Sequence, residues 1–257
     1  MLFCVQALLW LFWFFLGACL FSFAGVVACR LPRGEGTLWG RSHCLSCGKI
    51  LGPAELIPCL SYLLQRGRCR GCGGKIPARD FGIELLGGLC ACAAMLRWGG
   101  ERDRVWVTLL ALLLLVTVAL TDYDTKEIYD RFHVLLLLCG VAAIWAFPET
   151  ELSARLIGCV VLSVPMLIVA LFLPYSFGGG DIKLAFALGF LLGWRGIVCV
   201  MFLSFFAAGS LCIWRLARKQ AGWKDQIAFG PFLCAGAAVA LFYGNEVVDW
   251  WLGLAKY

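Results

Sequence analysis

Long apolar runs separated by short polar segments dominate this chain. A helix that crosses a lipid bilayer needs roughly 20 mostly apolar residues, and we count about eight runs that approach or meet this length. They cover approximately residues 3–28, 81–96, 105–121, 132–147, 154–173, 184–194, 197–216 and 227–252. The sixth run is short and rich in glycine, and only Trp194–Gly196 separate it from the seventh. We therefore predict two helices there, although they resemble one long helix.

The composition agrees with a membrane protein. Hydrophobic residues make up 62% of the 257 residues and charged residues only 15%, whereas a soluble domain carries about 25% charge. We predict an all-α polytopic membrane protein with about eight transmembrane helices. Its main partner is then the lipid bilayer, and we expect no nucleic acid partner.

The polar segments divide the chain into three predicted parts. Residues 1–29 form a first transmembrane anchor, residues 30–80 a cysteine-rich loop domain, and residues 81–257 a multi-helix membrane domain. The first run is similar to a signal peptide, but no Lys or Arg precedes Arg30. A signal peptide begins with positive charge, so we expect this segment to be retained.

The distribution of Lys and Arg predicts the orientation, because cytoplasmic loops carry an excess of both. With eight spans, 16 of the 22 basic residues fall on the side that holds residues 30–80. That side should be the cytoplasm, with both termini facing outward. The cluster of Arg97, Arg102 and Arg104 contradicts the rule.

Four cysteines in the loop domain have the spacing of a metal site. Cys44 and Cys47 form one Cys-x-x-Cys pair, and Cys69 and Cys72 form another, 21 residues further on. Four thiolates suit tetrahedral Zn²⁺, and a closed shell of four protein ligands indicates a structural ion. The alternatives are two disulfides, which a reducing cytoplasm disfavours, or no bond at all.

Two acidic clusters lie at the predicted cytoplasmic ends of spans. In the first, Asp122 directly follows the run 105–121 and precedes Asp124, Glu127 and Asp130. If the helix continued, Asp122 and Lys126 would share one face. In the second, Gly178, Gly179 and Gly180 precede Asp181. Each cluster alone has an ordinary explanation, a charged loop for the first and a helix cap at Asp181 for the second.

Two aspartates at one membrane face suggest a shared chemistry. When two carboxyl groups lie close together, one retains its proton while the other is ionised. The ionised group can deprotonate a water molecule while the protonated group polarises a carbonyl. This is the chemistry of an aspartic peptidase.

The same residues resemble a known family. Gly178-x-Gly180-Asp181, followed by Ile182-Lys183, resembles the glycine-x-glycine-aspartate motif of the type IV prepilin peptidases. The segment from Asp122 to Asp130 resembles their first aspartate motif. The loop is similar to their N-terminal domain through Arg30-Leu31-Pro32, both Cys-x-x-Cys pairs, Ser61-Tyr62-Leu63, Arg66-Gly67 and Cys69-Arg70. One residue departs from the pattern, because Tyr129 stands where the family usually has proline.

The resemblance implies an activity and its site. Asp122 and Asp181 would be the catalytic pair, supported by Gly178, Gly180, Lys183, Asp124 and Asp130. The substrates would be precursors of type IV pilins and of type II secretion pseudopilins, cut after a glycine at the cytoplasmic membrane face. Relatives with the cysteine loop also methylate the new N-terminus with S-adenosylmethionine. The sequence assigns no residue to that cofactor.

Other interpretations remain open at this stage. A zinc-dependent membrane transporter or assembly factor would use the aspartates along an ion path, although such proteins place acids near the middle of spans. A preflagellin-type peptidase would lack methylation, and the cysteine loop argues against it. Glu84 is interpreted as a packing partner and His133 as a residue at a membrane boundary. Lys183 either adjusts the charge of the aspartate pair or marks the end of its span.

Overall fold

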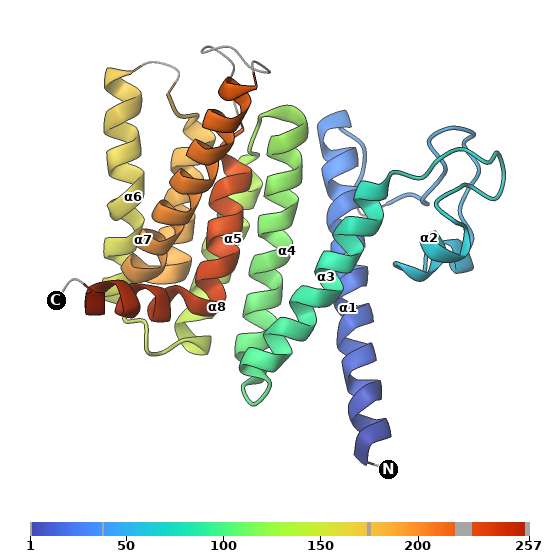
Figure 1. Ribbon diagram of the computed structural model, residues 1–257, viewed down its shortest axis with the longest axis horizontal. Coiled ribbons are helices and arrows are strands. Elements are labelled where there is room, and N and C mark those ends of the chain that lie inside the picture. The colour runs from blue at the N-terminus through green and yellow to red at the C-terminus, as the bar shows by residue number, and fades with distance from the viewer. Residues whose placement is uncertain (1, 38, 174–175, 219–227, 255–257) are drawn as a thin grey trace. The chain divides into compact units, whose positions relative to one another are not determined.

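Helices make up most of the described chain. The computed structural model describes residues 2–37, 39–173, 176–218 and 228–254. Within these ranges it has no strand, only the isolated bridges His43–Ile50 and Arg68–Lys75. The elements are α1 (Leu2–Arg30), η1 (Leu31–Arg33), η2 (Pro53–Glu55), α2 (Leu60–Leu64), α3 (Ala78–Trp98), α4 (Arg102–Thr125), α5 (Asp130–Ala146), α6 (Leu152–Phe172), α7 (Gly179–Ala217) and α8 (Gly230–Leu254) (Figure 1).

The chain forms two compact units, Met1–Val105 and Trp106–Tyr257. In the first unit α1 packs along α3. The two helices approach closely at Gly17 and Gly87, where a Cβ added to Gly17 would lie 2.2 Å from the Gly87 carbonyl oxygen. Small residues allow this close packing of membrane helices. The division of the chain into three parts, with boundaries after residues 29 and 80, remains a prediction.

Glu84 anchors the loop domain to the helices of the first unit. Its carboxylate accepts a hydrogen bond from the Ser22 hydroxyl of α1 at 2.8 Å. It also accepts one from the backbone N–H of Cys59 in the loop at 2.7 Å. The interpretation of Glu84 as a packing partner is confirmed.

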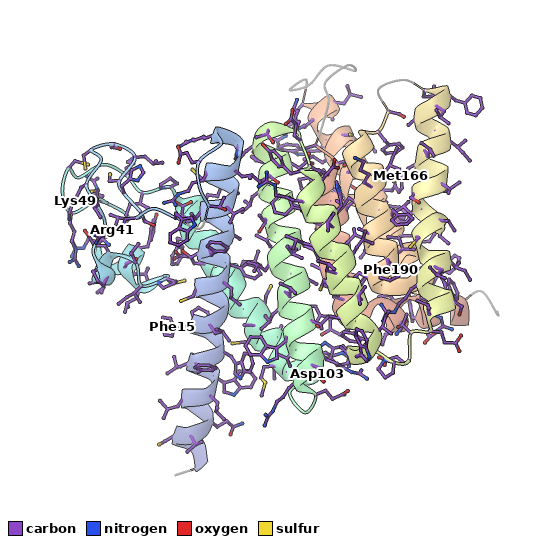
Figure 2. The ribbon with its side chains drawn as sticks, turned by 180° about the vertical axis from the view of Figure 1, so that it is seen from behind. Phe15, Arg41, Lys49, Asp103, Met166 and Phe190 are labelled. Atoms are coloured by element: carbon purple, nitrogen blue, oxygen red, sulfur yellow. The ribbon has the colours of Figure 1, made fainter. Side chains whose placement is uncertain are left out.

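In the second unit α7 is the central element, since α5, α6 and α8 all pack against it. The closest approach joins Gly158 of α6 to Gly189 of α7, where a Cβ on either residue would overlap the backbone of the other. Met166 and Phe190 add side-chain packing among these helices (Figure 2). The backbone of α7 thus lies directly against α6.

A break at Gly193 divides α7 into two helices. Gly193 has φ 75° and ψ 176°, a conformation that is open to glycine and strained for other residues. The two halves run in opposite directions, so both ends of α7 lie at the same end of the unit (Figure 1). The predicted pair of helices with a short connection is confirmed.

The buried side chain of Arg155 lies near this break. Only 1% of the residue is exposed. Its guanidinium donates to the carbonyls of Phe190 and Leu191 in α7 at 3.2 and 2.6 Å. It also donates to Thr150, Ala143 and Phe147, at the end of α5 and in the loop that follows. The guanidinium thus connects carbonyl groups near the end of α5 with carbonyl groups at the end of the first half of α7.

The predicted membrane spans are all helical. Six described helices are long and apolar enough to cross a membrane, and α7 counts among them as one. The predicted span in α5 is a helix of 17 residues. With the two halves of α7 counted separately, the eight apolar runs correspond to eight helical segments. Large apolar side chains such as Leu171 and Phe206 are more than 70% exposed, as expected of surfaces that face lipid.

Several basic residues that entered the orientation count have specific partners in the structure. Arg97 and Arg104 stack on the ring of Trp98, at 4.7 and 5.1 Å from its centroid, and Arg104 pairs with Glu101. Arg155 is buried, so it is no loop charge at all. Lys219, Lys224 and Lys256, which contributed to the count, lie outside the described residues.

Candidate active site and metal centre

Asp122 lies in the last turn of α4, and only 5% of it is exposed. Its Oδ2 atom accepts a hydrogen bond from the backbone N–H of Gly230 at 3.0 Å. The helix ends three residues later, because Lys126 has φ 57°. Lys126 is therefore outside the helix, so the condition under which it would share a face with Asp122 is not met.

Gly230 begins α8 and leaves no room for a side chain. A Cβ at this position would lie 2.5 Å from Asp122 Oδ2 and 3.2 Å from Ile128 Cδ1. The close approach lets the backbone amide reach the carboxylate directly. Sequence reasoning did not identify Gly230, and its 108-residue separation from Asp122 gives no local signal.

Asp181 lies in the first turn of α7. Its Oδ2 atom accepts a hydrogen bond from the backbone N–H of Gly178, the N-cap residue, at 3.2 Å. A carboxylate three residues inside a helix often returns to the N-cap amide in this way. The helix-cap interpretation and the active-site interpretation of Asp181 thus apply to the same carboxylate.

The three glycines before Asp181 differ in the space around them. A Cβ on Gly178 would lie 3.3 Å from Asp181 Oδ2, and one on Gly180 would lie 3.1 Å from Ile128 Cβ. A Cβ on Gly179 would meet nothing within 4 Å. The motif Gly178-x-Gly180 thus agrees with the geometry, since only its middle position is open.

The two aspartates lie close enough to interact electrostatically. Buried Cys234, one helical turn after Gly230, lies within electrostatic range of both carboxylates. The ends of three helices therefore bring Asp122 and Asp181 together, each held by a glycine amide. Such a pair can share a proton and activate a water molecule.

Two of the predicted supporting residues, Lys183 and Asp130, contact each other. The Lys183 ammonium contacts Asp130 Oδ1 at 2.7 Å. Both side chains are more than half exposed, so the ion pair contributes little to stability. Asp124 is exposed in the last turn of α4. Lys183 therefore joins α7 to the start of α5.

Tyr129 keeps the backbone shape expected of the family proline. It is the N-cap of α5, with φ −73° and ψ 134°, and proline fixes φ near this value. Its ring packs against Phe132 at 6.4 Å. The substitution thus preserves the backbone conformation before Asp130.

Three aromatic rings gather next to the glycines that hold the aspartates. Phe177 precedes Gly178 and Phe229 precedes Gly230, and their ring centroids lie 5.6 Å apart. Phe205 contacts both rings, at 6.1 and 5.4 Å. Sequence reasoning missed this cluster, because single aromatic residues within apolar segments carry no distinct signal.

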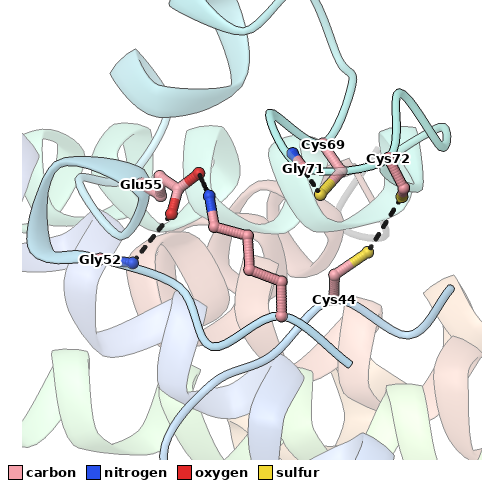
Figure 3. A network of polar contacts seen from close by, with 7 residues as sticks. Cys44, Gly52, Glu55, Cys69, Gly71 and Cys72 are labelled. Carbon is pink, nitrogen blue, oxygen red and sulfur yellow. Dashed lines mark hydrogen bonds and ion pairs between the residues drawn. The ribbon is translucent and has the colours of Figure 1, made fainter. Parts of the chain in front are cut away.

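The four predicted metal ligands come together in the first unit. The sulfur atoms of Cys44, Cys47, Cys69 and Cys72 all lie within 4.8 Å of one another. The sulfurs of Cys44 and Cys72 are 3.9 Å apart (Figure 3). Tetrahedral Zn²⁺ with Zn–S bonds of ≈ 2.3 Å separates its sulfurs by about 3.8 Å, so the four thiols could hold such an ion.

The two cysteine pairs have the same backbone hydrogen bonds. Gly48 N–H donates to the Cys44 carbonyl at 2.8 Å, and Gly73 N–H donates to the Cys69 carbonyl at 2.9 Å. Both glycines have φ 71°. Gly71 N–H also donates to the Cys69 sulfur at 3.3 Å (Figure 3). Each pair is thus a tight turn that presents two sulfurs in one direction.

The pKa values of the two thiols in the first pair are shifted in opposite directions. The backbone N–H groups of Ser46 and Cys47 lower the pKa of Cys44 to about 6. The backbone N–H of Lys49 lowers the pKa of Cys47, but its hydrogen bond with Cys72 and its burial outweigh this and raise the pKa to about 11.

Comparison with known proteins identifies the family of this chain. Residues 109–213 match the type IV leader peptidase family, and residues 15–98 match the bacterial peptidase A24 N-terminal domain. The prepilin leader peptidase/N-methyltransferase of Bacillus subtilis is 31% identical over 247 residues, which cover 94% of this chain and 97% of the relative. The protein of the same name from Burkholderia pseudomallei is 33% identical over 221 residues, covering 84% and 71%.

A third relative of this name, from Aeromonas hydrophila, is 34% identical over 220 residues, covering 82% of this chain and 74% of its own. No solved structure matches the chain significantly. The matched segments contain the four cysteines and both aspartates. The chain belongs to the type IV leader peptidase family.

Proposed function

We propose that this protein is a membrane aspartic endopeptidase that removes the leader of prepilins, with Asp122 and Asp181 as its catalytic pair. The observation that carries the proposal is that Asp122 and Asp181 interact electrostatically while each accepts a hydrogen bond from a glycine amide, Gly230 and Gly178 respectively. Family membership favours this function over the transporter or assembly factor.

The chemistry requires one ionised and one protonated carboxyl group. The ionised group takes a proton from a water molecule, whose oxygen attacks the scissile carbonyl carbon. The protonated group donates its proton to the carbonyl oxygen. Collapse of the tetrahedral intermediate breaks the C–N bond, and the leaving amine takes a proton. Asp124 and Asp130 support the site or contact the leader, and Lys183 either adjusts the charge of the aspartate pair or marks the end of its span.

The proposed substrates are precursors of type IV pilins and type II secretion pseudopilins, cut after glycine. A basic leader is attracted to the acidic residues that surround the pair, in particular Asp124, Glu127 and Asp130. The excess of Lys and Arg on the same predicted side supports a cytoplasmic location of the site in a bacterial inner membrane.

Zinc is proposed as a structural ion of the loop domain. Cys44, Cys47, Cys69 and Cys72 would hold it, and the sulfur positions fit a tetrahedral ion. When bound, the ion would tie two distant parts of the loop together.

A second activity is proposed from the names of the relatives alone. The new N-terminal amine would attack the methyl carbon of S-adenosylmethionine, the carbon–sulfur bond would break, and the amine would lose a proton. We assign this cofactor to none of the described residues.

Cleavage of a prepilin-like substrate in proteoliposomes tests the proposal. Wild type and Asp181→Asn would be compared by mass spectrometry, with S-adenosylmethionine present. Removal of the leader by wild type alone would support the aspartic peptidase, and a further 14 Da on the product, one methyl group replacing hydrogen, would support the methyltransferase. Full cleavage by Asp181→Asn would contradict the catalytic pair.

A further inference from the structure

The side chain of His133 is buried within the protein. It lies in the first turn of α5, and only 7% of the side chain is exposed. Its Nε2 atom lies 3.1 Å from the carbonyl oxygen of Gly180. A carbonyl only accepts hydrogen bonds, so Nε2 carries the proton and donates it.

This bond reaches the peptide group that leads into Asp181. The Gly180 carbonyl and the Asp181 N–H belong to one planar peptide unit. That N–H donates to the Gly178 carbonyl at 3.1 Å. His133 and Gly178 therefore hold the two ends of one rigid plane, and the Asp181 side chain extends directly from it.

Asp130 and Lys183 lie on the other side of the imidazole. Its Nδ1 atom is 3.5 Å from Asp130 Oδ1, an electrostatic contact rather than a hydrogen bond. The same oxygen contacts the Lys183 ammonium at 2.7 Å. Lys183 follows Asp181 in α7. Two contacts therefore connect the start of α5 with the start of α7, one from His133 to Gly180 and one from Asp130 to Lys183.

We propose that His133 is a positioning residue for the leader peptidase reaction. Its Nε2–H holds the Gly180 carbonyl and thereby fixes the direction in which Asp181 faces Asp122. The inference rests on the proposed function, because it needs Asp181 to take part in the chemistry. His133 itself contacts only the backbone of the motif and the Asp130 carboxylate.

Substitution of His133 by Leu should lower kcat roughly tenfold to a hundredfold, because small displacements of a catalytic group have effects of this size. KM should stay within about twofold, since an interaction that positions a reacting group affects the transition state more than substrate binding. Exposed Arg131, two positions earlier, provides the matched control, and Arg131→Gln should keep the kcat of wild type.

Substitution of His133 by either of two amide residues distinguishes a positioning role from a packing role. The side-chain nitrogen of Gln can take the place of imidazole Nε2, whereas that of Asn reaches only as far as Nδ1. We expect His133→Gln to recover most of the kcat that His133→Leu loses, and His133→Asn to recover little. Thermal unfolding in detergent would establish that all three variants are folded.

The outcomes are distinguishable from those that test the proposed function. An inactive Asp181→Asn together with a fully active His133→Leu would overturn the positioning role and leave the catalytic pair intact. Equal loss of kcat in the folded Gln, Asn and Leu variants would also overturn it. An active Asp181→Asn would instead contradict the proposed function.

Discussion

The metal centre and the aspartate pair are built in contrasting ways. The four cysteines lie within 29 consecutive residues, and each turn is closed by a hydrogen bond from the glycine that follows the pair to the carbonyl of its first cysteine. The aspartates come from α4 and α7, and the amide that holds Asp122 comes from α8. A site of the first kind forms from local chain geometry, whereas a site of the second kind forms only when distant helices pack correctly.

Loss of the metal should be the largest single effect. Replacing Cys47 and Cys72 by Ser removes one thiolate from each pair, so bound zinc should fall from about one ion per chain to nearly none. Metal analysis of the purified protein would measure this. Because the aspartates lie in the second unit, we expect the double variant to retain more cleavage than Asp181→Asn. Unchanged zinc content would contradict the four-thiolate site.

The substitution Gly230→Ala should lower cleavage by disturbing the aspartate pair. A Cβ 2.5 Å from Asp122 Oδ2 must displace the carboxylate or the start of α8, and we expect cleavage to fall about a hundredfold. Bound zinc should not change. Gly179→Ala is the control, since its Cβ would meet open space, and cleavage assays should find it close to wild type. Similar losses in both variants would argue against the clash as the cause.

Glu84→Ala should have a smaller effect, on stability. It leaves the Cys59 N–H and the Ser22 hydroxyl without their acceptor, which costs about 1–3 kcal/mol for an unsatisfied buried group. Thermal unfolding in detergent would measure the loss. Ser22→Ala removes only one of the two bonds and should cost less. Loss of zinc from Glu84→Ala would show that the metal loop depends on α1 and α3 for its fold.

The sequence predicted both sites, but it predicted the metal centre more completely than the aspartate pair. The spacing of Cys44, Cys47, Cys69 and Cys72 predicted a complete ligand set, because each pair is a self-contained turn. Asp122 and Asp181 were predicted from their motifs, while the amide of Gly230 and the bond from His133 to Gly180 were not. These partners are brought together by the packing of helices that are distant in the sequence. No spacing between residues in the sequence indicates that packing.

The spans were predictable because bilayer thickness sets their length. The break at Gly193 was also predictable, since a short polar connection interrupts the apolar sequence there. The position of Arg155 was not, because an arginine near a span end normally indicates a charged loop. Only the arrangement of α5, α6 and α7 shows that five carbonyl groups surround it.

The guanidinium of Arg155 also constrains how the protein is made. An arginine held in an apolar surrounding without partners costs several kcal/mol. Ala143, Phe147 and Thr150 are synthesised before Arg155, so the end of α5 and the loop that follows it offer three of the five carbonyl groups before α7 is made. Phe190 and Leu191 are synthesised later, and the first half of α7 completes the set. Arg155 thus links α6 first to the end of α5 and then to the first half of α7, in the order in which these segments are synthesised.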